Sequence, residues 1–241
     1  LLERRVPAAK ISVIPNGVDV AAFQPQPPDR ELREQWNGAG KFVCAYIGTI
    51  GMAHGLEVVL TAAQKLRDDG REDVQFWIVG DGAERARLQQ QATEQRLDNI
   101  TFTGMIPKSQ VDRVLASCDA CLVHLRGTEL FGTVIPSKVF ETMAMNVPII
   151  MGVKGQAQDI VLNGQGGVPM TPDDADSLLE CLDAVARDPM EYSRGRDYVA
   201  RHFHRDELAA RLLEIVAAIA DGKPPHAPLK SEIVKTPAKA A

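Results

Sequence analysis

Two kinds of apolar pattern alternate along the middle of the chain. Short runs in which nearly every residue is apolar are separated by longer segments in which apolar residues recur every three to four positions. The first pattern is typical of strands buried on both faces of a parallel sheet, and the second of amphipathic helices that cover such a sheet. The runs predict strands at 42–48, 74–80, 100–104, 120–125, 147–152 and 166–170, and the segments predict helices at 55–70, 83–96, 109–118, 137–145, 154–163, 172–188, 188–202 and 205–220.

This alternation predicts an α/β fold, a Rossmann-like doubly wound parallel sheet over residues 41–190. Residues 1–40 are interpreted as an interdomain segment and linker, with a short strand at 10–14 and an ordered proline-rich stretch after it. Residues 191–221 are predicted to form C-terminal helices that would pack on a further domain outside these residues. Residues 222–241 are rich in Pro, Ala and Lys, which predicts a disordered tail.

Length and charge narrow the classes of function. A chain of 241 residues with 45% hydrophobic content can bury at least one substantial core. The net charge is −5 and the basic residues are spread along the chain, so the extended basic surface that nucleic acids require is missing. No apolar run approaches the ~18 residues that cross a bilayer, and no signal peptide is recognisable. The chain opens at Leu1 without methionine, which predicts a fragment of a larger protein.

The cysteines point to a reducing compartment. Cys44, Cys118, Cys121 and Cys181 fall inside apolar segments, which favours reduced, buried thiols in a cytoplasmic protein that could lie at the inner face of the membrane. Cys118 and Cys121 form a C-x-x-C, but a zinc or redox site needs a second ligand pair or an exposed turn. The buried interpretation is therefore favoured, and no metal site is predicted.

In open parallel sheets, ligands bind where the carboxyl ends of the strands meet the helices that follow. The loop after the first strand is rich in glycine, and its candidate ligand contacts are Gly48, Thr49, Ile50, Gly51 and His54. The glycines allow close backbone approach, and phosphate oxygens could be received here, although tight turns without a ligand contain similar glycines. The spacing does not match the G-x-G-x-x-G fingerprint and no acidic residue ends the next strand, so an NAD site is not expected.

The next two loops offer weaker candidates. Gly80 and Asp81 follow the second strand, where Asp81 could contact a ligand or simply cap the following helix. Met105 and Ile106 follow the third strand. Their apolar side chains could sandwich a flat base, although ordinary core packing explains them as well.

The stretch "PSKVFETMAMNVPII" at residues 136–150 is the most informative. Pro136 and Ser137 open a helix, and Lys138 stands in its first turn, where the helix dipole disfavours a cation. A diphosphate bound at this helix end would explain the lysine, and Glu141, one turn deeper, could accept both hydroxyls of a ribose. The alternative is a local Lys–Glu ion pair, which would contribute only ~0.3 kcal/mol.

These motifs occur in a familiar order. "VIPNGVD", "GTIGMAHGLE", "IVGDGAER", "FTGMIPKSQV" and "VIPSKVFETMAMNVPII" follow one another, and over about residues 3–220 the chain resembles the donor-binding C-terminal half of family 4 glycosyltransferases of the GT-B fold. It is most similar to the bacterial branch described as fucosamine-transferase-like. The resemblance implies retaining transfer of a hexosyl or N-acetylhexosaminyl group from a nucleotide-sugar donor, usually a UDP-sugar, without an obligate metal or other cofactor.

The resemblance also assigns roles to residues. It implies that the turn at 136–138 binds the diphosphate, that Glu141 binds the ribose, and that residues 104–106 hold the uracil. Lys138 and Glu141 become the candidate catalytic residues. Many relatives carry two glutamates separated by seven residues, whereas this chain has Thr133 at the first position. Relatives also place arginine and lysine in the first loop, and Lys138 would replace that cation here.

Two further side chains are implicated at the end of the fourth strand. His124 and Arg126 could line the donor-sugar pocket, because both lie at a strand's carboxyl end. For Arg126, a solvated loop charge is an equal alternative.

The acceptor is expected to bind through an N-terminal Rossmann domain that these residues do not include. The implied acceptor is a glycan or a lipid-linked glycan in bacterial surface polysaccharide or glycolipid synthesis, with peripheral membrane association left open and no nucleic-acid partner. The isolated half is expected to bind donor weakly and turn over little. Two alternatives remain, a non-catalytic sugar-nucleotide-binding or interaction module and a UDP-sugar 2-epimerase, which would need further carboxylates in the cleft.

Overall fold

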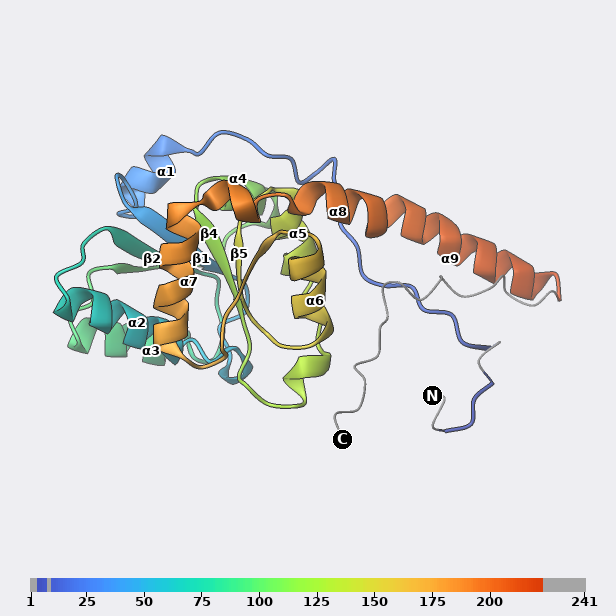
Figure 1. Ribbon diagram of the computed structural model, residues 1–241, viewed down its shortest axis with the longest axis horizontal. Coiled ribbons are helices and arrows are strands. Elements are labelled where there is room, and N and C mark those ends of the chain that lie inside the picture. The colour runs from blue at the N-terminus through green and yellow to red at the C-terminus, as the bar shows by residue number, and fades with distance from the viewer. Residues whose placement is uncertain (1–3, 8–9, 223–241) are drawn as a thin grey trace.

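The computed structural model describes residues 4–7 and 10–222 (Figure 1). Within them, six parallel strands form one sheet in the order β3-β2-β1-β4-β5-β6. The order reverses between β1 and β4, which is the switch point of a doubly wound sheet. The predicted Rossmann-like fold is confirmed. The strands are β1 Phe42–Ile47, β2 Val74–Val79, β3 Ile100–Gly104, β4 Ala120–His124, β5 Ile149–Gly152 and β6 Gly167–Pro169.

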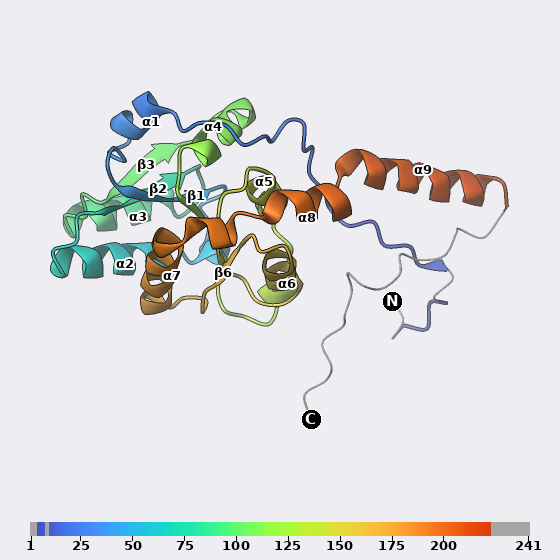
Figure 2. The same ribbon diagram turned by 45° about the horizontal axis from the view of Figure 1, so that its top comes forward.

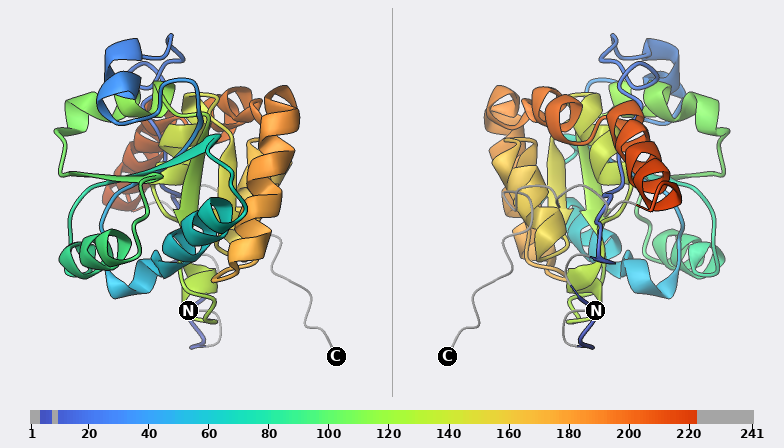
Figure 3. Two further views of the ribbon diagram at one scale, coloured as in Figure 1. Left: turned by 90° about the vertical axis from the view of Figure 1, so that its left-hand side faces the viewer. Right: turned by 90° about the vertical axis from the view of Figure 1, so that its right-hand side faces the viewer.

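Helices cover both faces of this sheet (Figure 3). The α-helices are α1 Arg30–Gln35, α2 Glu57–Asp68, α3 Arg85–Glu94, α4 Val111–Ala116, α5 Lys138–Ala144, α6 Gln156–Asn163, α7 Ala175–Arg187, α8 Gly195–His202 and α9 Arg205–Ala220. Short 3-10 turns are η2 Met52–His54, η3 Lys108–Gln110, η4 Phe131–Thr133 and η5 Pro189–Tyr192.

Two buried clusters hold the layers together, one on each face. Successive β1 residues alternate between them, with Val43 and Ala45 in the first and Cys44 and Tyr46 in the second. This is the two-residue period of a strand that is buried on both sides. The first cluster includes residues of α4, α5, α6 and α8, and the second includes residues of α2, α3 and α7.

The N-terminal segment differs from its prediction in two places. The strand predicted at 10–14 is wrong, because these residues find no neighbouring strand in the described structure and Val13 is 58% exposed. Helix α1, which the prediction missed, begins where the Asp29 side chain accepts a hydrogen bond from the Leu32 amide at 2.9 Å. Leu32 is buried in the first cluster, so α1 packs on the domain.

The C-terminal helices contact the N-terminal segment around Val18. The helix predicted at 188–202 is interrupted, since η5 ends at Tyr192 and α8 begins at Gly195. The amide of Val18 then donates to the carbonyl of Phe203 at 2.9 Å. Helix α9 projects away from the sheet (Figures 1 and 2) and exposes four large apolar side chains, Leu212, Leu213, Val216 and Ile219. Apart from Gly222, the predicted tail at 222–241 lies outside the described residues.

Candidate functional site

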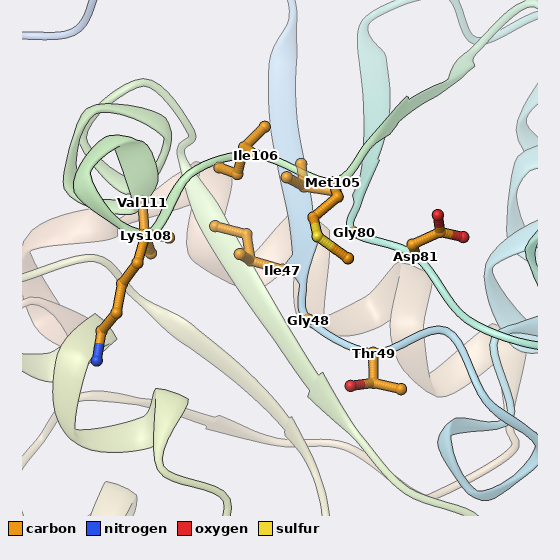
Figure 4. Close-up of a pocket in the computed structure, with 10 residues that line it drawn as sticks. Ile47, Gly48, Thr49, Gly80, Asp81, Met105, Ile106, Lys108 and Val111 are labelled. Atoms are coloured by element: carbon orange, nitrogen blue, oxygen red, sulfur yellow. The ribbon is translucent and has the colours of Figure 1, made fainter.

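A pocket of about 280 Å³ opens at the carboxyl ends of β1, β2 and β3 (Figure 4). The three loops that follow these strands form its wall, as parallel topology dictates. Residues predicted as ligand contacts contribute six of its ten lining positions, and the others come from strand ends, η3 and α4. The lining residues are Ile47, Gly48, Thr49, Val79, Gly80, Asp81, Met105, Ile106, Lys108 and Val111.

The first two loops approach each other through their backbones. Gly80 has a φ of +135°, and a Cβ there would overlap the carbonyl oxygen of Gly48. The amide of Ile50 donates to the carbonyl of Asp81 at 2.8 Å, which ties the loops together one step further on. The side chain of Ile50 is fully buried, so only its backbone belongs to the site. Glycine is therefore required at position 80 by the meeting of two main chains.

Lys138 projects from the start of α5 towards the first loop. Its ammonium lies over the ring of Tyr46, 3.9 Å from the centroid, and a Cβ added at Gly48 would be 2.7 Å from Nζ. None of the ion pairs found in the described residues includes this ammonium, so the local pair with Glu141 is not formed. Burial lowers the pKa of Lys138 from 10.5 to about 8. A half-buried cation without a carboxylate partner suits a site that receives an anion.

His54 lies beside the same aromatic ring, with its imidazole centroid 5.9 Å from that of Tyr46. Its Nδ1 accepts a hydrogen bond from the Gly51 amide at 3.3 Å, so the neutral imidazole carries its proton on Nε2. Burial, together with the Lys138 ammonium, lowers the pKa of His54. A neutral Nε2–H remains a hydrogen-bond donor for an anion.

Glu141 lies one turn into α5 and is half-buried. Burial raises the pKa of its carboxyl, while Lys108, Arg205 and Lys138 oppose that rise. Lys108, which the sequence analysis did not single out, also lines the pocket. The available signal was its position as the first cation after the loop that follows β3. The carboxyl of Glu141 therefore lies in the electrostatic field of a pocket residue without lining the pocket itself.

Of the remaining predicted residues, Pro136 and Ser137 lie at the start of α5, whereas Thr133 lies away from the pocket. Ser137 precedes α5 and its hydroxyl makes no capping hydrogen bond, while the carbonyl of Pro136 accepts from the Val139 amide at 3.1 Å. Thr133 is exposed on η4, and its hydroxyl donates to the Leu130 carbonyl at 2.8 Å. Thr133 is thus satisfied within its own turn and is not brought to the pocket.

The described residues contain neither a cluster of metal ligands nor a membrane-spanning helix. Among them, no group of three or more His, Cys, Asp or Glu side chains could hold a metal ion. The four cysteines are buried and unpaired, and burial raises the pKa of the Cys118 and Cys121 thiols. No helix in residues 4–7 and 10–222 has the length and apolar character needed to cross a membrane.

The sheet and the pocket at its carboxyl edge define a Rossmann-like α/β domain with its ligand site beside the switch point. The profile of the family described as "Glycosyl transferases group 1" matches residues 41–188, which is more than half of the chain. The chain therefore belongs to this family, whose structural relatives are enzymes of the GT-B fold.

Individual relatives agree with this assignment. The probable glycosyltransferase WbjE of Pseudomonas aeruginosa is 29% identical over 153 residues, which are 63% of this chain and 37% of that protein. A GDP-mannose-dependent alpha-(1-6)-phosphatidylinositol monomannoside mannosyltransferase of Mycolicibacterium smegmatis is 26% identical over 219 residues, 88% of this chain and 57% of the enzyme. The chain spans about half the length of the curated relatives it matches.

A solved structure shows the same fold. The Anabaena protein Alr3699/HepE, crystallised with UDP and glucose, matches with a TM-score of 0.72 at 23% identity, over 86% of this chain and 56% of that one. None of the relatives named here is described as a fucosamine transferase, so that part of the resemblance stays a prediction.

Proposed function

We propose that this chain binds the nucleotide-sugar donor of a retaining glycosyltransferase, with a UDP-sugar as the donor. The observation that carries the proposal is the ammonium of Lys138, held against Tyr46 and Gly48 without a carboxylate partner. The donor's diphosphate would lie between this ammonium, the loop of Gly48 and Thr49, and the turn at 136–138.

The hydrogen-bond donors around this position suit a diphosphate, which carries two negative charges. His54 offers Nε2–H, and Ser137 offers a hydroxyl that no capping bond engages. Hydrogen bonds to an ionised acceptor are roughly twice as strong as those between neutral groups. Lys108 adds a second cation on the pocket wall. Together these groups would compensate the charge of a diphosphate in a half-buried site.

Glu141 and the loop after β3 would hold the nucleoside. The carboxyl of Glu141 would accept hydrogen bonds from both ribose hydroxyls, one turn deeper than the diphosphate. The base would lie against Met105 and Ile106, which supply apolar surface at the pocket wall. Met105 is 78% exposed, so a flat base would cover apolar surface that faces solvent.

The chemistry follows from where charge develops. Breaking the bond between the sugar and the diphosphate leaves negative charge on the departing oxygen, and Lys138 would stabilise it. The acceptor must be oriented beside the anomeric carbon on the same face, a task that we assign to a second domain. We propose transfer of a hexosyl or N-acetylhexosaminyl group to a glycan or lipid-linked acceptor in bacterial surface polysaccharide or glycolipid synthesis.

Calorimetric titration of UDP, GDP and ADP into the 241-residue chain tests the proposal. UDP is expected to bind best, and GDP is included because one relative is GDP-mannose-dependent. Lys138→Ala and Glu141→Ala should each weaken UDP binding by about tenfold or more, since hydrogen bonds to charged groups contribute ~1.5–3 kcal/mol.

Lys41→Ala and Glu180→Ala serve as matched controls, because Lys41 precedes β1 at the opposite end of the sheet and Glu180 is exposed on α7. Both should leave the affinity unchanged. Equal heats for the wild type and for both site variants would remove the proposed site.

A further inference from the structure

His124 ends β4, and its imidazole is buried, with 1% of the residue exposed. The ring fits only because the two positions that face it, 55 and 152, are glycines. A Cβ at Gly152, the end of the neighbouring strand β5, would overlap the ring at Cδ2, and a Cβ at Gly55 would lie 3.1 Å from Cε1. Gly55 also has a φ of +55°, which favours glycine for a second reason. The ring therefore fills a space that neighbouring positions leave open.

Both ring nitrogens of His124 are engaged by main-chain groups of opposite character. Nδ1 lies 2.7 Å from the carbonyl oxygen of His54, and the amide of Asp173 lies 2.9 Å from Nε2. A carbonyl can only accept and an amide N–H can only donate. Nδ1 must therefore carry the proton and Nε2 the lone pair, which fixes a neutral imidazole in a single tautomer.

The two hydrogen bonds of the His124 ring join segments that are far apart in sequence. His54 belongs to the loop after β1, whereas Asp173 precedes α7 in the turn after β6. Asp173 has a φ of +60°, an uncommon conformation for a residue with a side chain, and its carboxylate accepts from the Gly127 amide at 2.7 Å. Through Asp173 the link reaches the loop after β4 as well. Three loops at the carboxyl edge of the sheet are thus fastened around one buried ring.

We propose that His124 is a positioning residue of the donor site: its neutral Nδ1–H imidazole clamps the His54 carbonyl to the turn before α7. The clamp holds the loop from Gly48 to Gly55, so that Thr49 and the His54 side chain keep their places beside the pocket. The effect on a donor rests on the proposed function, but the clamp itself does not.

The charged groups that face His124 come from each element packed on it. The Asp173 carboxylate lies 3.9 Å from Nε2, Glu57 opens α2, Arg126 follows β4, and His54 lies in the first loop. Burial is the largest influence and lowers the pKa of His124, and Arg126 adds to that effect, whereas the hydrogen bond to the His54 carbonyl and the carboxylates of Asp173 and Glu57 oppose it. The imidazole is therefore expected to stay neutral at pH 7 and to gain a proton only below its ordinary range.

Nitrogen NMR on the wild-type chain tests the tautomer directly. With 15N-labelled histidine, long-range proton–nitrogen spectra distinguish a protonated nitrogen from one with a lone pair, and loss of one set of signals in His124→Asn assigns the residue. We expect Nδ1 protonated and Nε2 unprotonated at pH 7. A proton on Nε2, or a charged ring at that pH, would overturn the proposal.

Two variants separate the clamp from simple packing. In His124→Asn, the amide nitrogen takes the place of Nδ1 and can still donate to the His54 carbonyl, whereas His124→Leu removes both bonds. We expect UDP affinity to fall about tenfold in the Leu variant and to recover to within about threefold in the Asn variant, as loss of one orienting contact predicts. His202→Asn, a half-buried histidine on α8, is the matched control and should not change the affinity.

Hydrogen exchange makes the outcome independent of the nucleotide. The amides of Ile50 and Gly51 should exchange faster in His124→Leu than in the wild type, and at nearly the wild-type rate in His124→Asn. If the wild type does not bind UDP, the proposed function fails while the exchange rates still decide the clamp. If UDP binds the wild type and the Leu variant equally, the positioning role fails while the donor site stands.

If His124→Leu does not fold, the remaining experiments still test the proposal. Circular dichroism identifies that case for His124→Leu, and the wild-type spectrum together with the Asn variant then decides. Faster exchange and weaker UDP binding in the Asn variant, to the level of the Leu variant, would contradict the role given to the His54 link.

Discussion

The loops after β1 and after β4 lie at the same edge of the sheet but are held differently. In the first, the Tyr46 hydroxyl donates to the Thr49 carbonyl at 2.6 Å, and the His54 carbonyl accepts from His124. In the second, the Gly127 amide is bonded to the Asp173 carboxylate, but residues 128–130 beyond it are exposed, and η4 is held mainly by short-range bonds such as Phe131 N–H to the Thr128 carbonyl at 3.2 Å.

This difference separates two tasks. Groups that are fixed before a ligand arrives cost no ordering when it binds, which suits the recognition of a constant part such as a diphosphate. An exposed loop tolerates change in sequence and shape, which suits the part of a ligand that varies between enzymes. We infer that, in the proposed donor site, the first loop would recognise what donors share and the second what distinguishes them.

The largest effect is expected where two backbones meet. Gly80→Ala places a Cβ against the Gly48 carbonyl at a φ of +135°, so we expect a loss of about 3 kcal/mol in the free energy of unfolding. Urea denaturation measures it. The control in the second loop is Gly132→Ala, where a Cβ would meet nothing within 4 Å. An equal loss in both variants would erase the contrast between the loops.

Removing the charge at Lys138 is expected to have the next largest effect. Lys138→Met keeps the packing on Tyr46 but loses the cation, so UDP affinity should fall by about tenfold or more. The same change should raise the melting temperature, because burying an ammonium opposes folding. Thr133→Ala is the control in the second loop and should alter neither quantity. Calorimetry and thermal unfolding decide; a less stable Lys138→Met protein would contradict the burial argument.

A smaller effect should follow pH. The pKa of Lys138 is lowered from 10.5 to about 8 in the folded chain, so the unfolded chain binds this proton more tightly. The contribution of this group to stability therefore rises as pH increases from about 8 to 10.5.

Donor binding should change in the opposite direction. UDP affinity is expected to fall as pH rises through about 8, because the neutral amine attracts a diphosphate less. In Lys138→Arg, whose guanidinium stays charged, this fall should vanish if the variant binds. Titrations at pH 7, 8 and 9 measure it, and an unchanged wild-type affinity would remove Lys138 from the diphosphate site.

The smallest effect concerns apolar contact with the base. Met105→Ala should weaken UDP by about threefold, since it removes part of the apolar surface that the base would cover. Leu130→Ala, on a similarly exposed residue of the second loop, should leave UDP binding unchanged. Competition titrations resolve such differences. A stronger response at Leu130 would exchange the roles given to the two loops.

Much of the fold was predictable because burial on both faces leaves a plain pattern. Strand β2 has all six residues buried, and five of the six, all but Gln75, are apolar. Helix α1 was not predicted because it has six residues and buries only Leu32, so its sequence shows no helical period. The strand predicted at 10–14 failed for the opposite reason, since alternation alone does not supply a neighbouring strand.

The sequence could predict those parts of the site that follow from the topology of the sheet. The carboxyl ends of parallel strands converge, so Gly48, Gly80 and Met105 could be placed together before any contact was known. The clamp at His124 could not. Its tautomer depends on the His54 carbonyl and the Asp173 amide, two main-chain groups that no sequence pattern marks.

Helix α9 has a practical consequence for anyone who purifies this chain. Its apolar stripe of Leu212, Leu213, Val216 and Ile219 faces water, and such stripes promote self-association as concentration rises. Replacing Leu212 and Leu213 by glutamate should keep samples dispersed in the calorimeter cell and the NMR tube. The sheet should tolerate both changes, because neither residue belongs to its two buried clusters.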